Sequence, residues 1–364
     1  MAADLMDLHK RASDWPLYKI TFGHLSPQKS LKKSFEKRRL GNRLSKRLDQ
    51  TFEIYLKDLL QLNRRVNVLL EHKYRVQFFD SARKIIGDWD SLSRCVNGVL
   101  GSKISGWNLS IWRKGKQYSR YKGMWVDAPA PLEVIATLSE TLVKHDKKFS
   151  FGEIEKHVLF LQSHGNSTPI WHPRFPISLR NPHTAAVIGH VLHDGHLEKR
   201  NLRVVYCNKE RENISHFKRS VEVMLGTKIK FGEVSDKDGN IVVYCPNILG
   251  YFLVLFGLQP GNKVENNVAP PLGLMKCQES LLRSYLRALA TDEASPHLVS
   301  DFGGRIWVGL ASRSRTKPSK LIKADWEMFR RIGIKAGPIR LARVRLTKHG
   351  EVSAQWFFVI WGRK

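Results

Sequence analysis

Two apolar, helix-compatible segments that end in acids recur about 100 residues apart, and this repeat constrains the fold most. The first segment, HTAAVIGHVLHDGHL, contains Gly189 and ends at Asp194-Gly195. The second segment, SLLRSYLRALATDEAS, ends at Asp292 and Glu293. Strand-like runs and a further helical pattern follow each segment in the same order. The sequence therefore predicts two pseudo-symmetric halves of mixed helix and antiparallel strand.

Small residues inside the two segments predict how the segments pack. Two helices can cross with their backbones close together only where side chains are small or absent. Gly189 in the first segment and Ala288 in the second suit such a crossing. The crossing would bring the two helix ends side by side, so that each end delivers one carboxylate. The candidates are Asp194 in the first segment and Asp292 or Glu293 in the second.

The first segment resembles the nine-residue signature of the LAGLIDADG family of homing endonucleases and their relatives. The signature corresponds to residues 187–195, where Gly189 matches the internal glycine and Asp194-Gly195 match the terminal acid and glycine. The second segment is similar to the family variant FLRGLFDTEGS over residues 285–295, and this register selects Glu293 over its neighbour. The resemblance covers roughly residues 179–364, half of the chain.

The resemblance implies an α+β fold, in which a pseudo-two-fold pair of αββαββα repeats carries antiparallel, saddle-like sheets that sit in the DNA major groove. The repeats would span residues 179–270 and 271–364. Asp194 and Glu293 would hold Mg²⁺ or another divalent cation, which activates water for phosphodiester cleavage. Lys263 is a candidate charge-stabilising lysine near the cut phosphate, although a surface lysine is the more common case.

The second segment departs from the family pattern at the crossing point and directly after its acid. Ala288 and Ala294 stand where the family usually has glycines. A displacement of the carboxylate by about 1 Å can cost roughly 10²-fold in rate. A relative that has lost cleavage and acts as a DNA-binding transcriptional regulator is therefore an alternative. An RNA-binding intron maturase is a second alternative, because charge alone does not separate DNA from RNA.

Basic residues on the predicted strands are candidates for DNA contact. Arginine can bond guanine with two hydrogen bonds, and lysine mostly neutralises phosphate. The alternative is that these residues only keep the sheets soluble. The candidates are Arg203, Lys228 and Lys230 in the first half, and Arg305, Arg313, Arg340, Arg343 and Arg345 in the second.

The N-terminal half contains a second candidate DNA-binding unit. Residues 1–75 are basic and mostly helix-compatible, with an amphipathic helix predicted from residue 52. Residues 76–145 predict short helices in an order that resembles the helix–turn–helix domains of phage repressors. The stretch GVLGSKIS between two of the helices is longer than the usual turn. The alternative is a helical domain without DNA contact, and the Pro-containing residues 146–178 predict a linker or a docking strand.

The helix–turn–helix resemblance implies roles for the residues of one helix. Trp107, Asn108 and Ser110 would face the bases, and Arg113 and Lys114 would contact phosphates.

The charge balance favours a polyanionic partner. The chain has 61 Lys and Arg against 33 Asp and Glu, a net charge of +28. Such a charge on a chain with 42% hydrophobic residues predicts nucleic-acid binding rather than a disordered basic tail, with an anionic membrane surface or a ribosome as alternatives. We expect double-stranded DNA as partner, no membrane insertion, and a monomer, because one chain supplies both halves.

The cysteine and histidine patterns say less about the function of the protein. Four widely spaced cysteines form no CxxC pair, which favours a reducing compartment, and we expect an intracellular protein that is cytoplasmic or nucleoid-associated. His190, His193 and His196 are spaced like a metal ladder, but interface or exposed histidines are the favoured interpretation.

Overall fold

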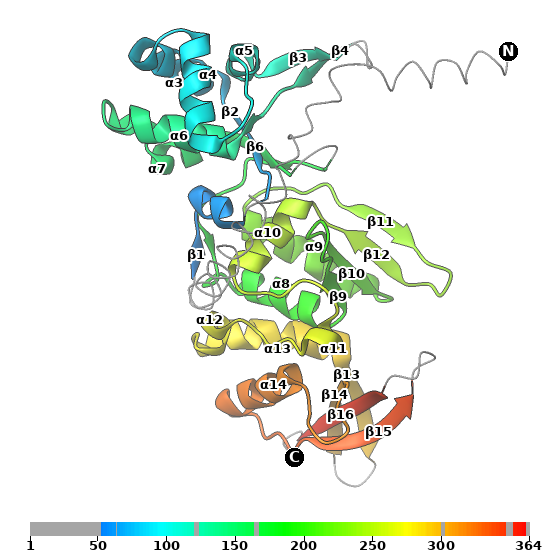
Figure 1. Cartoon of the computed structure of the whole chain (residues 1–364). Coiled ribbons are helices and arrows are strands. Elements are labelled where there is room, and N and C mark those ends of the chain that lie inside the picture. Colours follow the sequence, from blue (N-terminus) through cyan, green and yellow to red (C-terminus); the bar gives the residue numbers. More distant parts are fainter. Residues whose placement is uncertain are drawn as a thin grey trace, which may run out of the picture.

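A computed structural model describes residues 52–62, 64–119, 124–163, 167–299, 303–346 and 352–361. It shows a mixed helical and antiparallel-sheet protein with an N-terminal module followed by two α/β units along its length (Figure 1). The predicted basic arm before residue 52 lies outside the described residues. In the described part, no helix is both long and apolar enough to cross a membrane.

The N-terminal module packs helices against a small antiparallel sheet of order β5-β2-β6-β7 and carries a separate β3–β4 hairpin. Its helices are α3 (His72–Ile86), α4 (Trp89–Leu100), α5 (Gly106–Lys114), α6 (Leu132–Leu142), the 3₁₀ helix η4 (Lys147–Phe149) and α7 (Phe151–Lys156). Its strands are β2 (Asn67–Leu70), β3 (Lys116–Ser119), β4 (Met124–Asp127), β5 (Ala130–Pro131), β6 (Val158–Gln162) and β7 (Ile170–Trp171).

The helix boundaries of this module follow local sequence signals. Asp88 caps α4 by accepting a hydrogen bond from the Ser91 backbone N–H. Ser105 and Asn108 form a reciprocal capping box at the start of α5. Gly101 ends α4 in the left-handed region, with φ of 61°. The helices predicted between residues 76 and 142 are therefore present, and residues 101–105 connect α4 to α5.

The amphipathic helix predicted from residue 52 is wrong. This stretch instead forms β1 (Glu53–Ile54) and a 3₁₀ helix, η3 (Leu56–Leu62). Strand β1 pairs with β8 (Ile177–Ser178), and η3 packs against α10 (Asn247–Leu255) of the first α/β unit. Pairing with distant segments has overridden the local helical periodicity.

The predicted domain boundaries also change. Residues 146–178 are not a linker, because η4, α7, β6 and β7 belong to the N-terminal module. The predicted docking strand exists only as β8. The prolines of this stretch all lie outside the strands, as expected for residues that have no backbone N–H to donate. They are Pro169, Pro173 and Pro176.

The two α/β units follow one plan, in which a helix leads into a hairpin, a second helix and a second hairpin. The first unit comprises α8 (Pro182–Leu192), β9 (Gly195–Leu197), β10 (Val204–Asn208), α9 (Arg211–Leu225), β11 (Gly232–Ser235), β12 (Ile241–Tyr244) and α10. The second comprises α13 (Glu279–Glu293), β13 (Ala294–Val299), β14 (Gly303–Ser312), α14 (Lys320–Arg331), β15 (Arg340–Leu346) and β16 (Val352–Trp361). Short helices α11 (Lys263–Asn266) and α12 (Leu272–Met275) join them.

The sheets of the two units have the same strand order. The first reads β9-β10-β12-β11 and the second β13-β14-β16-β15. In each sheet the second strands of the two hairpins pair at the centre. Strands β9 and β13, which follow the acid-ended helices, were missed because no separate strand pattern or turn signal marks them.

Helices α8 and α13 pack along each other at the centre of the two units (Figure 1). A Cβ atom on Gly189 would lie 2.8 Å from the Tyr285 carbonyl oxygen and 2.9 Å from the Ala288 Cβ. The predicted crossing at Gly189 and Ala288 is therefore confirmed.

Candidate functional site

The ends of α8 and α13 bring two acids close enough for the charge of one to affect the pKa of the other. Asp194 follows α8 by two residues, and Glu293 is the last residue of α13. One oxygen of Asp194 accepts a hydrogen bond of 2.8 Å from the Asn208 side chain. Burial raises the pKa of Asp194 to about 7, and the charges of Asp292 and Glu293 raise it further. Burial likewise raises the pKa of Glu293.

Lys263 supplies the positive charge at this position and is not a surface lysine. Its ammonium group donates hydrogen bonds to the carbonyl oxygens of Leu192, at 3.0 Å, and His193 at the carboxyl end of α8. Burial lowers the pKa of Lys263, whereas the charges of Glu293 and Asp194 oppose that shift. The lysine thus lies where the helix dipole and both acids favour a cation.

Asp292 has a different environment from its neighbour Glu293. Its side chain is 0% exposed and accepts hydrogen bonds from the Tyr206 hydroxyl at 2.7 Å and from His190 Nδ1 at 2.9 Å. The other ring nitrogen of His190 bonds His216 at 2.9 Å. Asp292 therefore joins α13 to the first unit, and its oxygens are occupied within the protein.

A second buried hydrogen-bond network joins the end of α8 in the first unit to α13 and α14 in the second. His193 Nε2 lies 3.2 Å from Asp325 on α14, and the Tyr285 hydroxyl donates to the same carboxylate at 2.8 Å. His196, by contrast, is exposed. His190 and His193 are thus interface residues, as the sequence favoured. Sequence reasoning missed Asp325, Tyr206 and His216, because nothing local marks a partner more than 20 residues away.

The donor set at the helix ends fits a magnesium ion, which takes oxygen ligands and usually binds through one or two carboxylates together with substrate phosphates. Asp194 and Glu293 supply such carboxylates, and burial disfavours their ionised forms unless positive charge lies nearby. Among the described residues, no three His, Cys, Asp or Glu side chains cluster as a metal site.

The outer face of the second sheet gathers several predicted DNA contacts. Residues directly opposite in an antiparallel pair share a face. Arg340 is opposite Phe357, Arg343 opposite Gln355, and Arg345 opposite Ser353, whereas the buried Trp356 and Phe358 face the helices. The three arginines therefore point away from α14, and all three are exposed.

Aromatic side chains lie among these arginines. The rings of Trp307 and Phe357 stack at a centroid distance of 4.5 Å. The Arg305 guanidinium lies 4.4 Å from the ring centroid of Trp361, its cross-strand neighbour. The outer face thus combines flat apolar surface with guanidinium groups, both of which suit contacts with bases and backbone.

Other predicted contacts are not on strands, which corrects their expected placement. Lys228 and Lys230 precede β11, and Lys228 pairs with Glu222 at 2.8 Å. Arg203 precedes β10 and pairs with Glu198 at 2.8 Å.

Arg313 is the remaining residue of this group. It follows β14 and pairs with Glu265 at 2.9 Å. It therefore links the second unit to helix α11.

In the N-terminal module, the predicted contact residues divide in two. Trp107 is 56% exposed and Lys114 is exposed, whereas Ser110 is half-buried. Arg113 forms a two-pronged ion pair with Asp80 at 2.6 and 2.7 Å, so its guanidinium is tied to α3.

The Asn108 side chain is also partly engaged in hydrogen bonds within the protein. It serves the capping box of α5, where its side-chain oxygen accepts from Ser105. The adjoining β3–β4 hairpin, which sequence reasoning missed, exposes Tyr118 and Trp125.

Comparisons with known proteins give structural similarity only. No family model matches the sequence, and no curated protein does. Mesophilic variants of the homing endonuclease I-DmoI match at 17% identity, covering 49% of this chain and 82% of that chain, with a TM-score of 0.33. Full-length DUF199/WhiA from Thermatoga maritima matches at 10% identity, covering 50% and 52%, with a TM-score of 0.32. I-DmoI with DNA and Mn matches at 15% identity, covering 49% and 89%, with a TM-score of 0.31. Similarity of this size carries no conclusion about activity.

The raised pKa of Asp194 predicts that this acid weakens the fold at neutral pH. Its pKa rises from 3.8 to about 7 on folding, so the folded chain holds the proton more tightly and ionisation favours unfolding. We expect Asp194→Asn to match the wild type near pH 4 and to be more stable at pH 8. Because the carboxyl is only partly buried, the gain is about 1 kcal/mol, or roughly 2 °C in Tm.

Thermal unfolding of both proteins between pH 4 and pH 8 measures this difference. Asp238→Asn, on an exposed turn, is the matched control and should follow the wild-type profile. A gain for Asp194→Asn that does not depend on pH would contradict the electrostatic cause.

Proposed function

We propose that this protein binds double-stranded DNA sequence-specifically. It would use the outer faces of the sheets of its two α/β units, together with its N-terminal helical module. The observation that carries the proposal is the exposed row of Arg340, Arg343 and Arg345 on one face of β15. Alternate residues of a strand, such as Arg343 and Arg345, lie about 6.8 Å apart, close to two base steps of about 3.4 Å along one DNA strand, and the bulge between Leu341 and Arg343 brings Arg340 onto the same face. Arginines at this spacing can reach every second base along one strand.

The N-terminal module supports the same proposal. Its exposed Trp107 and Lys114 lie on one helix next to an exposed hairpin, and the whole chain carries a net charge of +28. Two binding units on one chain raise the effective concentration of the second after the first has bound. A single chain would therefore suffice for a long site.

Replacing Arg340, Arg343 and Arg345 together with glutamine tests the sheet face. Each two-pronged contact contributes about 1–3 kcal/mol, so we expect affinity for a selected duplex to fall at least about 100-fold. The slope of log K against log salt should decrease in magnitude by up to about 2.7, since each phosphate contact contributes about 0.9. Fluorescence anisotropy at several salt concentrations measures both quantities.

The control removes three charges from the helices behind the sheets. Arg219 on α9 and Lys320 and Lys323 on α14 are all exposed, and their replacement by glutamine leaves the sheet face intact. An equal loss of affinity in this control would indicate non-specific attraction rather than a built interface. Preferential binding of structured RNA by the wild type would favour the RNA alternative.

Hydrolysis of the bound DNA is a second candidate function, favoured by Asp194 and Glu293 at the adjoining helix ends. A divalent ion held by both carboxylates would supply activated water and would stabilise the leaving oxygen. Asn208 orients Asp194, and Lys263 balances both acids. A DNA-binding regulator that does not cut is the competing candidate, because Lys263 already supplies one positive charge to this site.

A further inference from the structure

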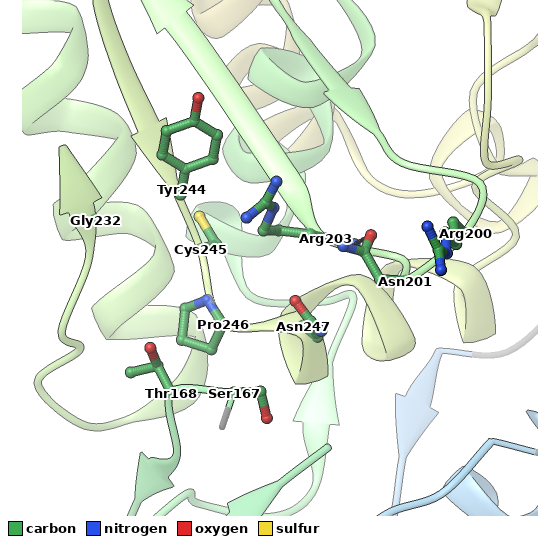
Figure 2. Close-up of a pocket in the computed structure, with 10 residues that line it drawn as sticks. All are labelled: Ser167, Thr168, Arg200, Asn201, Arg203, Gly232, Tyr244, Cys245, Pro246 and Asn247. Carbon is green, nitrogen blue, oxygen red and sulfur yellow. Dashed lines mark hydrogen bonds between the residues drawn. The ribbon is translucent and has the colours of Figure 1, made fainter. Parts of the chain in front are cut away.

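A cavity of about 500 Å³ lies at one end of the sheet of the first α/β unit (Figure 2). Its lining comes from four places in the chain, one of which is Gly232 at the start of β11. Ser167 and Thr168 belong to the segment before β7, Arg200 and Arg203 to the loop before β10, and Asn247 to the start of α10. The cavity therefore lies where the N-terminal module joins the first α/β unit.

The described lining is positively charged and contains no acid. Arg203 donates from one terminal nitrogen to Glu198, which lies outside the lining, and its guanidinium sits 4.7 Å from the ring centroid of Tyr244. Its Nε atom is buried and has no hydrogen-bond partner among the described residues. The side chain as a whole is 38% exposed, so its terminal N–H groups remain accessible to an acceptor in the cavity.

Backbone and side-chain donors surround the same space. Asn247 is the first residue of the nine-residue helix α10, and no side chain caps that end. The first N–H groups of a helix lack partners inside it and, with the helix dipole, favour an anion. Thr168 lies next to Pro246 and directs its hydroxyl toward it, as Figure 2 shows. The neighbouring Ser167 hydroxyl points away and accepts a hydrogen bond from Ser163 at 2.6 Å.

We propose that this cavity binds a phosphate group. The arginines supply charge and fork-shaped donors, the Thr168 hydroxyl and the α10 backbone supply neutral donors, and phosphate oxygens accept from groups of both kinds. The phosphate can come from a DNA backbone or from a free nucleotide or phosphate ion. The first source extends the proposed DNA interface and so depends on the proposed function, whereas the second does not.

Two variants of the full-length chain test the cavity, and each acts differently. Arg200→Gln removes one guanidinium from the rim. Asn247→Asp places a carboxylate in the cavity but at a helix start, where an acid stabilises the helix, so the fold should be retained. Arg219→Gln on α9 is the control with the same charge loss as Arg200→Gln. Circular dichroism confirms folding of each protein.

The first arm titrates inorganic phosphate and adenosine monophosphate by calorimetry at low salt. If free phosphate is the ligand, the wild type and Arg219→Gln bind it, and both cavity variants bind at least tenfold more weakly. The second arm measures affinity for a selected duplex against salt. If the backbone is the ligand, Arg200→Gln lowers the salt slope by about 0.9, the contribution of one phosphate.

The outcomes separate the two proposals. Phosphate binding without any duplex binding would overturn the proposed function and support the cavity. Duplex binding that both cavity variants retain, with no free-phosphate binding, would overturn the cavity and leave the proposed function standing. Phosphate binding that neither variant changes would also overturn the cavity.

Discussion

Replacing Gly189 with valine is expected to force apart the two central helices and to unfold much of the α/β region. Even the first carbon of a side chain there would lie 2.8 Å from the Tyr285 carbonyl oxygen and 2.9 Å from the Ala288 Cβ. The carbonyl belongs to the backbone of α13 and cannot move without the whole helix. We expect a loss of about 3 kcal/mol or more, because overpacking of a rigid core adds to the strain of a branched side chain.

Denaturant unfolding of the valine variant and of two further variants measures this effect. Gly98→Ala on α4 is the control, because no atom lies within 4 Å of its added Cβ. It should be neutral or stabilising by about 0.5–1 kcal/mol. The exchange Gly189→Ala with Ala288→Gly should recover part of the loss caused by Gly189→Ala alone. A loss for Gly98→Ala as large as that for Gly189→Val would contradict the crossing as the cause.

Replacing Asp194 with asparagine and Glu293 with glutamine is expected to abolish any cleavage and to retain DNA binding. The substitutions keep the shape of both side chains but remove the charges that would hold a divalent ion. We expect the cleavage rate to fall about 10³-fold or more, since both candidate metal ligands are weakened at once. DNA affinity should stay equal or rise, because two negative charges next to the phosphates are removed.

A randomised duplex library with magnesium or manganese measures cutting and binding in one selection. Asp292→Asn is an informative control, because its carboxylate is bonded to His190 and Tyr206. We expect this variant to lose stability while the folded fraction still cuts. Specific binding by the wild type without cutting under either metal would rule out the endonuclease and favour a regulator. In that case, Lys263 serves as the permanent counter-charge of the two acids.

The sequence by itself determined most elements of the two α/β units and the crossing of their central helices. Strand β14 spans the predicted residues 303–312, and β16 the predicted 352–361. These predictions succeed because periodicity and turn residues are local properties, read within a few neighbouring positions. The Gly189–Ala288 crossing was predictable too, since the repeat itself aligns the two segments.

Only the tertiary structure decided the roles of the charged residues. It placed Lys263 against the end of α8, bonded Asp292 within the protein and tied Arg113 to Asp80. Each of these contacts joins residues 33 or more positions apart. A charged side chain has no periodic signature, and its role is set by whichever opposite charge, dipole or solvent the folded backbone brings near it.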